Sequence, residues 1–327
     1  MVKFTFVIPI YNLATYISAC LDSVREQTYA DWEAVCINDG SSDDSQRILD
    51  AYARRDSRIR VFNQINSGEG AARNMGLRVA TGNWVIFLDG DDVFAPNALM
   101  RIVEIHNAYP DVKLIRFDNV LFNDGDVCIF GNNKLNSVVQ IEDVSVKLTM
   151  ESLHVLATRH VYERSILDGL KFPSYLRGCD RLVITSVLLS RVNWLVSTDE
   201  VFYGYRMRNG SAMHVDTSRK ILVDEMSHRR DIIMMIEHSH KHVDYATDPW
   251  LEGFFTKDVG IRIARAPREE RSAMWHDWYS CICQLSDVNG LSRKARFIFR
   301  LCQLLPMAPV WWFLCRLLPW CERQIWK

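Results

Sequence analysis

The chain has 327 residues, of which 48% are hydrophobic, so it can bury a sizeable core spread over about two or three structural units. Its formal net charge of −1 gives no general attraction to polyanions, which argues against nucleic-acid binding. The nine cysteines lack the paired spacing of zinc sites, so reduced, cytosolic thiols are expected. The N-terminal apolar run ends without a small-residue cleavage site, so we expect a first strand rather than a signal peptide.

Short runs of β-branched and aromatic residues alternate with helical patterns along the first hundred residues. The runs at 3–8, 33–38, 59–63 and 84–88 are typical of strands that are buried on both faces of a parallel sheet. Helical stripes fill the gaps, and a fourth helix is expected to open at Pro96. This order predicts an α/β fold with a mostly parallel sheet, whose ligands bind beyond the carboxyl ends of the strands.

The rest of the chain is less regular. A further strand is expected within 112–122, followed by a mixed region to about residue 215. From Thr217 onward apolar residues recur at helical spacing, which predicts a helical extension. We therefore divide the chain into three parts, namely a first half-domain at 1–115, a second at 116–215 and a helical region at 216–327.

The stretch VIFLDGDDVF, residues 85–94, brings Asp89, Asp91 and Asp92 together at the end of the fourth strand. The simplest structural interpretation is an Asp-Gly turn in which Asp92 caps the following helix. Three like charges repel one another, however, and a divalent cation would offset that repulsion. Mg²⁺ and Mn²⁺ suit carboxylate oxygens and keep coordination positions for phosphate, so the cluster indicates a phosphate-bearing substrate.

Four unusual motifs occur in order along the same hundred residues. They are P-x-Y-N after the first strand, N-D-G-S-x-D after the second, then G-x-x-x-A-R-N-x-G, and D-x-D-D after the fourth. Together they resemble the family-2 inverting glycosyltransferases of the GT-A fold. The resemblance implies a UDP-sugar donor, an acceptor glycan, and a Mn²⁺ or Mg²⁺ ion that bridges the diphosphate of the donor.

The resemblance also assigns individual residues to the donor. Asp91 would ligate the metal, and Asp92 would support the same metal shell. The other donor-binding positions it implies are Pro9 and Tyr11 beside the base, Asp39 on the uracil edge, Arg73 and Asn74 near the nucleotide, and Asp89 at the ribose or the sugar.

Two segments of the second half also match the family. In KFPSYLRGCDRLVITSVLLSR, Asp180 aligns with the base that deprotonates the acceptor hydroxyl, although Cys179 stands where the family has Glu. The structural alternative for Asp180 is a carboxylate that stabilises a helix start. FYGYRMRNGSAMH resembles the family's Y-R-x-R-x-G-S segment, which makes Arg206, Arg208 and His214 candidates for diphosphate contact. A solvated sheet face is the alternative there.

The C-terminal segment 291–327 is basic and rich in tryptophan. It holds seven Lys or Arg residues against one acid, together with four tryptophans. Pro306, Pro309 and Arg316 interrupt it, so it lacks the ~20 continuous apolar residues of a spanning helix. We expect peripheral association with the inner face of the cytoplasmic membrane, with a core-packing helix as the alternative.

The leading hypothesis is a metal-dependent hexosyltransferase that acts on a lipid-linked glycan in O-antigen, capsule or exopolysaccharide synthesis. Two alternatives stay open, namely a Mg²⁺-dependent phosphatase that uses the DGDD loop and a non-catalytic protein that binds sugar nucleotides or membranes. SGEGAAR lacks the third glycine of the dinucleotide fingerprint, so NAD binding is not expected. His238, His240 and His242 are interpreted as a solvated helix end.

Overall fold

The computed structural model divides the chain into two compact units, each described here by itself. The first comprises 1–145 and 155–213, and the second comprises 146–154 and 214–327. Both predicted half-domains fall almost entirely in the first unit. The residues that the structure describes are 2–130, 137–144, 147–148, 156–173, 180–208, 226–227, 230–236, 238–239, 242–243, 268–285, 300 and 304.

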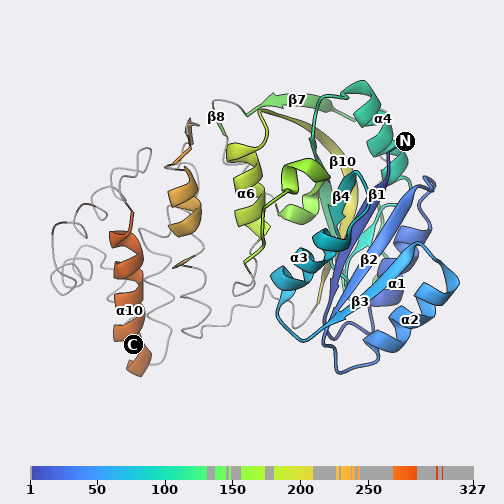
Figure 1. The fold of residues 1–327 in the computed structure, drawn as a ribbon, viewed down its shortest axis with the longest axis horizontal. Coiled ribbons are helices and arrows are strands. Elements are labelled where there is room, and N and C mark those ends of the chain that lie inside the picture. Colours follow the sequence, from blue (N-terminus) through green and yellow to red (C-terminus); the bar gives the residue numbers. More distant parts are fainter. Residues whose placement is uncertain are drawn as a thin grey trace. The chain divides into compact units, whose positions relative to one another are not determined.

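Four parallel strands form one half of the sheet in the first unit (Figure 1). They are β1 (Phe4–Ile10), β2 (Trp32–Asp39), β3 (Ile59–Gln64) and β4 (Trp84–Phe87), in the spatial order β3-β2-β1-β4. All four predicted strands are confirmed to within two or three residues at each end. The helices between and after them are α1 (Ile17–Arg25), α2 (Ser45–Arg55), α3 (Glu69–Val79) and α4 (Ala98–Ala108).

Helices cover both faces of this parallel half. Alternate residues of β1, such as Phe6 and Ile8, are buried in a core with apolar residues of α1, α2 and α4. On the other face, Val35 and Ile37 of β2 pack against Ala72 of α3. Burial on both faces is why these strands read as continuous apolar runs rather than as alternating patterns.

The other half of the sheet is mixed. β9 (His160–Glu163) is inserted antiparallel between β4 and β6 (Leu114–Asn123), and β10 (Trp194–Met207) runs parallel to β6. Two short strands, β5 (Val93–Phe94) and β7 (Val139–Asp143), pair antiparallel with β10. The strand predicted within 112–122 is confirmed as β6, whereas the sequence pattern did not reveal β5 or β9. The 3-10 helices η1 (Ala157–Arg159) and η2 (Arg164–Leu167) flank β9, and α6 (Asp180–Ser190) precedes β10.

The second unit contains α10 (Arg268–Cys283) and a pair of short parallel strands, β8 (Lys147–Leu148) and β11 (His242–Val243). Within the part of the chain that the structure describes, no helix combines the length and apolar character needed to cross a membrane. The predicted segment 291–327 lies outside the described residues except for positions 300 and 304.

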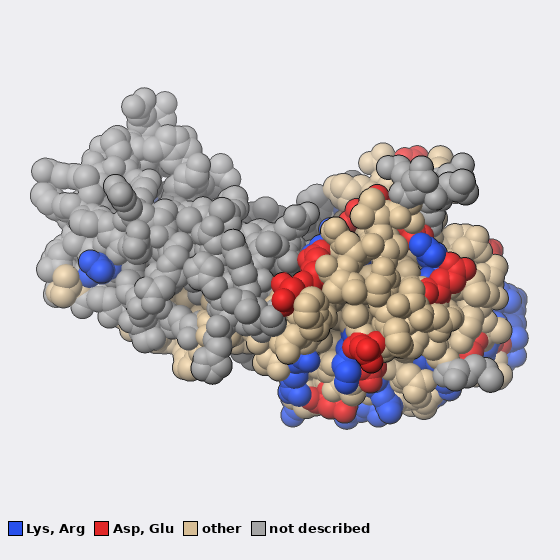
Figure 2. All heavy atoms as spheres, turned by 90° about the horizontal axis from the view of Figure 1, so that it is seen from above, with Lys and Arg blue, Asp and Glu red and all other residues tan. Residues whose placement is uncertain are grey.

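On the face of the first unit shown in Figure 2, acidic and basic side chains are interspersed.

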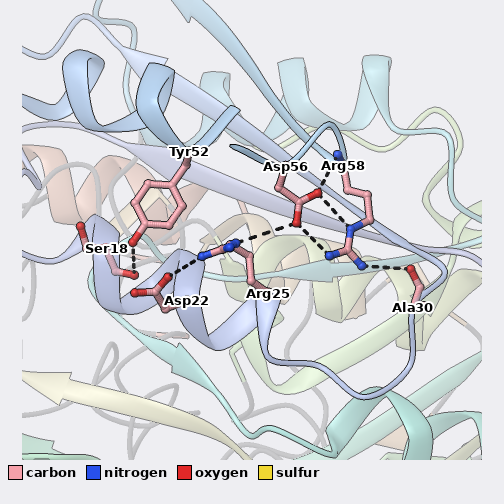
Figure 3. Close-up of polar contacts among 7 residues, drawn as sticks. All are labelled: Ser18, Asp22, Arg25, Ala30, Tyr52, Asp56 and Arg58. Carbon is pink, nitrogen blue, oxygen red and sulfur yellow. Dashed lines mark hydrogen bonds and ion pairs between the residues drawn. The ribbon is translucent and has the colours of Figure 1, made fainter. Parts of the chain in front are cut away.

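A polar network ties the outer helices to the start of β3 (Figure 3). Asp56, which follows α2, accepts hydrogen bonds from Nε and Nη2 of Arg58 at 3.0 and 2.8 Å. Arg25 of α1 approaches the same carboxylate at 3.9 Å, and the Tyr52 hydroxyl donates to the Ser18 carbonyl oxygen at 3.3 Å. These contacts fix α1 and α2 against each other at the sheet edge opposite the carboxyl ends of the strands.

A buried carboxylate joins the amino ends of all four parallel strands. Glu33 of β2 accepts hydrogen bonds from the Thr5 hydroxyl of β1 at 2.7 Å and from the Thr81 backbone N–H, just before β4, at 2.6 Å. Arg60 of β3 completes the set with an ion pair to Glu33 at 2.8 Å. Burial opposes ionisation, but these donors outweigh it and lower the pKa of Glu33 to about 2.

Glu33→Gln is expected to lower the free energy of unfolding by about 2–3 kcal/mol at pH 7. Because the pKa of Glu33 is depressed in the folded state, its contribution is complete above the ordinary value of 4.5 and is lost as the pH falls toward 2. Urea-induced unfolding of the full chain at pH 7 and pH 3.5 should therefore show a smaller difference between variant and wild type at the lower pH. Glu104→Gln, at a more exposed ion pair with Arg101, is the control and should shift stability by no more than about 0.5 kcal/mol. An equal deficit at both pH values would contradict this role of Glu33.

Candidate functional site

The acidic loop after β4 packs closely against the end of β1. A Cβ atom at Gly90 would lie 3.0 Å from Leu13 Cδ1 and 3.2 Å from the Pro9 carbonyl oxygen. Glycine therefore lets the loop approach the neighbouring strand at the position between Asp89 and Asp91. Pro9 itself is buried at the end of β1, and Tyr11 just beyond it is 50% exposed.

Asp92 joins this loop to β10. Its Oδ2 accepts a hydrogen bond from the Tyr203 hydroxyl at 2.6 Å, and its Oδ1 accepts one from the Arg206 backbone N–H at 2.7 Å. Burial raises the pKa of Asp92 well above its usual range, and the charges of Asp91 and Asp89 add to the rise. With both oxygens bonded and only 1% of the residue exposed, Asp92 holds the loop against β10, and it does not cap the following helix, which begins after Asn97.

Asp91 meets the two arginines at the end of β10. Its Oδ2 lies 2.6 Å from Arg208 Nε, and its carbonyl oxygen accepts a hydrogen bond from Arg206 Nε at 2.8 Å. Arg206 is also fixed from the other side, because its guanidinium lies 4.4 Å from the Phe122 ring centroid and 5.3 Å from that of Tyr16. The structure thus brings three sequence-predicted residues together at one edge of the sheet.

Asp89 and Arg73 form a second predicted pair. Arg73 is fully buried, and its Nη2 lies 2.7 Å from Asp89 Oδ1, while its Nη1 pairs with Glu69. Burial raises the pKa of Asp89 to about 6, although the charge of Arg73 acts in the opposite direction. Arg73 also lies over the Phe172 ring, 5.4 Å from its centroid. The guanidinium therefore sets the orientation of the first carboxylate of the DGDD loop.

Asp39 organises the start of α3. Its Oδ1 accepts hydrogen bonds from Gln64 Nε2 at 2.7 Å and from the Ser67 backbone N–H at 2.8 Å, and its Oδ2 accepts one from the Gly68 N–H at 2.8 Å. Gly68 has φ of 88°, a conformation that favours glycine. Three of the hydrogen-bonding positions of the Asp39 carboxylate are thus used within the protein, which the motif alone did not reveal.

Asn74 is bonded to the backbone rather than placed with its amide open to a ligand. Its Nδ2 donates to the Phe172 carbonyl oxygen at 2.7 Å, and its Oδ1 accepts from the Phe172 N–H at 2.8 Å. The Phe172 ring packs on Phe87 of β4, with the centroids 5.0 Å apart. Asn74 therefore anchors the segment that leads toward Asp180. α6 begins at Asp180, whose side chain lies outside the described residues, as do Cys179 and His214.

A model of glycosyl transferase family 2 matches residues 5–124, the part that carries β1 to β6 and the acidic loop. The chain carries a family-2 glycosyltransferase domain of the GT-A fold.

Relatives named as glycosyltransferases and a solved structure match this chain beyond residues 5–124. Glycosyltransferase GlyA of Streptococcus pneumoniae serotype 4 is 31% identical over 242 residues, which cover 69% of this chain and 34% of GlyA. The poly(ribitol-phosphate) beta-glucosyltransferase of Bacillus spizizenii is 26% identical over 299 residues, 85% of this chain and 44% of that protein. The structure of S. aureus TarS 1–349 in complex with UDP superposes with a TM-score of 0.70 at 19% identity, over 92% of this chain and 87% of that one. The matched part of this chain thus spans less than half the length of each of these two curated relatives.

The carboxylates at this edge of the glycosyltransferase domain fit a divalent cation that is held by few protein ligands. Among the described residues no group of three or more His, Cys, Asp or Glu side chains is arranged to hold a metal ion. Mg²⁺ needs only one or two protein carboxylates when substrate phosphate and water fill the other positions, and Mn²⁺ accepts the same oxygen ligands. Asp91, with a carboxylate that is 18% exposed beside two arginines, meets that requirement.

Sequence reasoning missed several residues of this edge. Tyr203 lies within the segment FYGYRMRNGSAMH, yet only the structure shows that its hydroxyl donates a hydrogen bond to Asp92. Tyr16 and Asp124 carried no sequence signal, because they are remote from each other along the chain. In the structure they are joined by a 2.9 Å hydrogen bond that lies beside Arg206. Alternation along β10 would place Tyr203 and Arg206 on opposite faces of the strand, so no local signal identified Tyr203.

Asp92→Ala and Asp91→Ala are expected to differ sharply in their effect on stability. Asp92→Ala leaves the buried Tyr203 hydroxyl and Arg206 N–H without an acceptor, and should lower the free energy of unfolding by about 2–4 kcal/mol. Asp91→Ala removes a partly exposed ion pair and should cost about 1 kcal/mol or less. Urea unfolding of both variants tests this, and equal losses would argue against the structural role of Asp92.

Proposed function

We propose that the protein is an inverting glycosyltransferase that moves a hexose from a UDP-sugar to a hydroxyl of an acceptor glycan. The observation that carries the proposal is the convergence of Asp91, Arg206 and Arg208 at the carboxyl edge of the sheet. One carboxylate beside two guanidinium groups suits a metal-bridged diphosphate. The family match, and a UDP complex of the TarS structure that shares the fold, support the choice of donor.

In the proposed reaction, this chain's residues hold the donor and move one proton. Arg206 and Arg208 bind and orient the diphosphate, and Asp91 is the residue that would hold a Mn²⁺ or Mg²⁺ ion. The bound ion would offset the negative charge that develops on the UDP leaving group. Asp180 removes the proton of the acceptor hydroxyl as its oxygen attacks C1 from the face opposite UDP, so the product is a β-linkage from an α-linked donor.

A lipid-linked or polymeric acceptor is the second part of the proposal. The similarity to a poly(ribitol-phosphate) beta-glucosyltransferase supports an acceptor built by a cell-surface polymer pathway. The basic, Trp-rich segment 291–327 supports peripheral attachment to the inner face of the cytoplasmic membrane, where such acceptors are assembled.

A thermal-shift panel of nucleotide sugars, each with and without Mn²⁺, tests the donor and the metal together. A UDP-sugar at 100 times its Kd adds about 2.7 kcal/mol to the stability of the folded protein, which should raise Tm by roughly 5 °C or more. Asp91→Asn should lose the Mn²⁺-dependent part of that shift. A GDP-sugar is the control for the base and should give a smaller shift. Equal Mn²⁺-dependent shifts in Asp91→Asn and wild type would refute the metal role.

Asp180→Asn separates donor binding from transfer. The variant should keep the wild-type thermal shift with UDP-sugar and Mn²⁺, because the base contacts the acceptor rather than the donor. UDP release in the presence of lipid-linked oligosaccharides should fall by about 10²–10⁴-fold. Asp168→Asn, an exposed carboxylate in the preceding turn, is the matched control and should transfer at the wild-type rate. Normal transfer by Asp180→Asn would assign the base to another residue.

A further inference from the structure

The two arginines at the end of β10 are held in different ways. Arg206 is fixed by its backbone bond to Asp92, by its side-chain bond to the Asp91 carbonyl oxygen and by the Phe122 ring, and its side chain is 9% exposed. Arg208 pairs with the Asp91 carboxylate at 2.6 Å and is 20% exposed. In the described part of the chain, Arg208 has no other hydrogen-bond partner, and its guanidinium otherwise lies only against the Tyr16 ring, 5.3 Å from the centroid. Arg206 is therefore a fixed element, and Arg208 is the one that can exchange its partner.

Arg208 and a divalent cation compete for the same carboxylate. Both would approach the Asp91 oxygens, and their positive charges repel each other at the short separation that this requires. A diphosphate changes the balance because its negative oxygens attract the metal and the guanidinium together. The planar guanidinium of Arg208 can donate two parallel hydrogen bonds to phosphate oxygens. Its contact with Asp91 uses only one donor, Nε, at 2.6 Å.

We infer that Arg208 is the counter-cation of Asp91 and makes divalent-metal binding depend on the nucleotide diphosphate. The inference rests on the proposed function and deepens it. The diphosphate takes over Arg208, which frees the Asp91 carboxylate for the metal. The two side chains are 20% and 18% exposed, so a diphosphate in solvent can reach the ion pair and exchange with it. Coupling of this kind is reciprocal, so the metal must strengthen UDP binding by the same factor as UDP strengthens metal binding.

The test is titration of Mn²⁺ into the full chain, with free Mn²⁺ followed by electron paramagnetic resonance, in the absence and presence of UDP. In wild type, UDP should tighten Mn²⁺ binding at least about five-fold. Arg208→Gln removes the competing charge, so it should bind Mn²⁺ alone roughly five-fold or more tighter than wild type and should gain less from UDP. Arg208→Lys keeps the charge and should stay close to wild type. Arg54→Gln, at an exposed position in the last turn of α2, controls for net charge.

Three results would overturn the inference. Wild type could bind Mn²⁺ equally with and without UDP, which needs no variant to detect. Arg208→Gln could bind Mn²⁺ alone no better than wild type. The double variant Asp91→Asn with Arg208→Gln could keep the gain, which would locate it away from Asp91. Failure of the proposed function looks different, because wild type would then bind neither Mn²⁺ nor UDP even when both are present.

Discussion

The candidate site depends on the two hydrogen bonds that Asp92 accepts from β10. The DGDD loop leaves the parallel half of the sheet, and β10 belongs to the mixed half. A buried carboxylate that accepts from the Tyr203 hydroxyl and from the Arg206 N–H fixes the register between the two. Because side chains alternate along a strand, this register determines which residues at the end of β10 can meet Asp91. The last acid of the motif thus places the cations around its neighbour.

The two ends of the parallel strands divide structural and functional work. At the amino ends, Glu33 gathers donors from its neighbours in a buried network whose pKa of about 2 marks it as strongly stabilising. At the carboxyl ends, Asp89 and Asp92 have raised pKa values because burial and mutual repulsion are not fully offset. The stabilising contacts of Glu33 at the amino ends help to offset the unfavourable burial of Asp89 and Asp92 at the carboxyl ends. Carboxylates with pKa values raised by burial and by neighbouring charges cluster at functional sites.

The sequence predicted the parallel half of the fold and the edge at which function collects, because apolar runs and polar strand exits are local signals. It did not predict β9, since a four-residue antiparallel insertion has no periodicity of its own. It also could not divide the motif residues between ligand and scaffold. Asp39 and Asn74 bond to the backbone of Gly68 and Phe172, contacts that are set by tertiary geometry. A motif identifies positions under constraint, and only the structure shows what each position contacts.

The Asn74 contact connects the proposed donor side of the site to the segment that precedes the proposed base. The same short helix, α3, presents Arg73 to Asp89 and Asn74 to the backbone of Phe172. Phe172 in turn packs on β4, the strand that leads into the DGDD loop, and the chain continues from it to Asp180. The inverting displacement proposed above would require the base, C1 and the leaving group to lie in line, so both halves of the site would have to share one rigid support. Arg73 and Asn74, adjacent residues of α3, would provide that support within a single turn of helix.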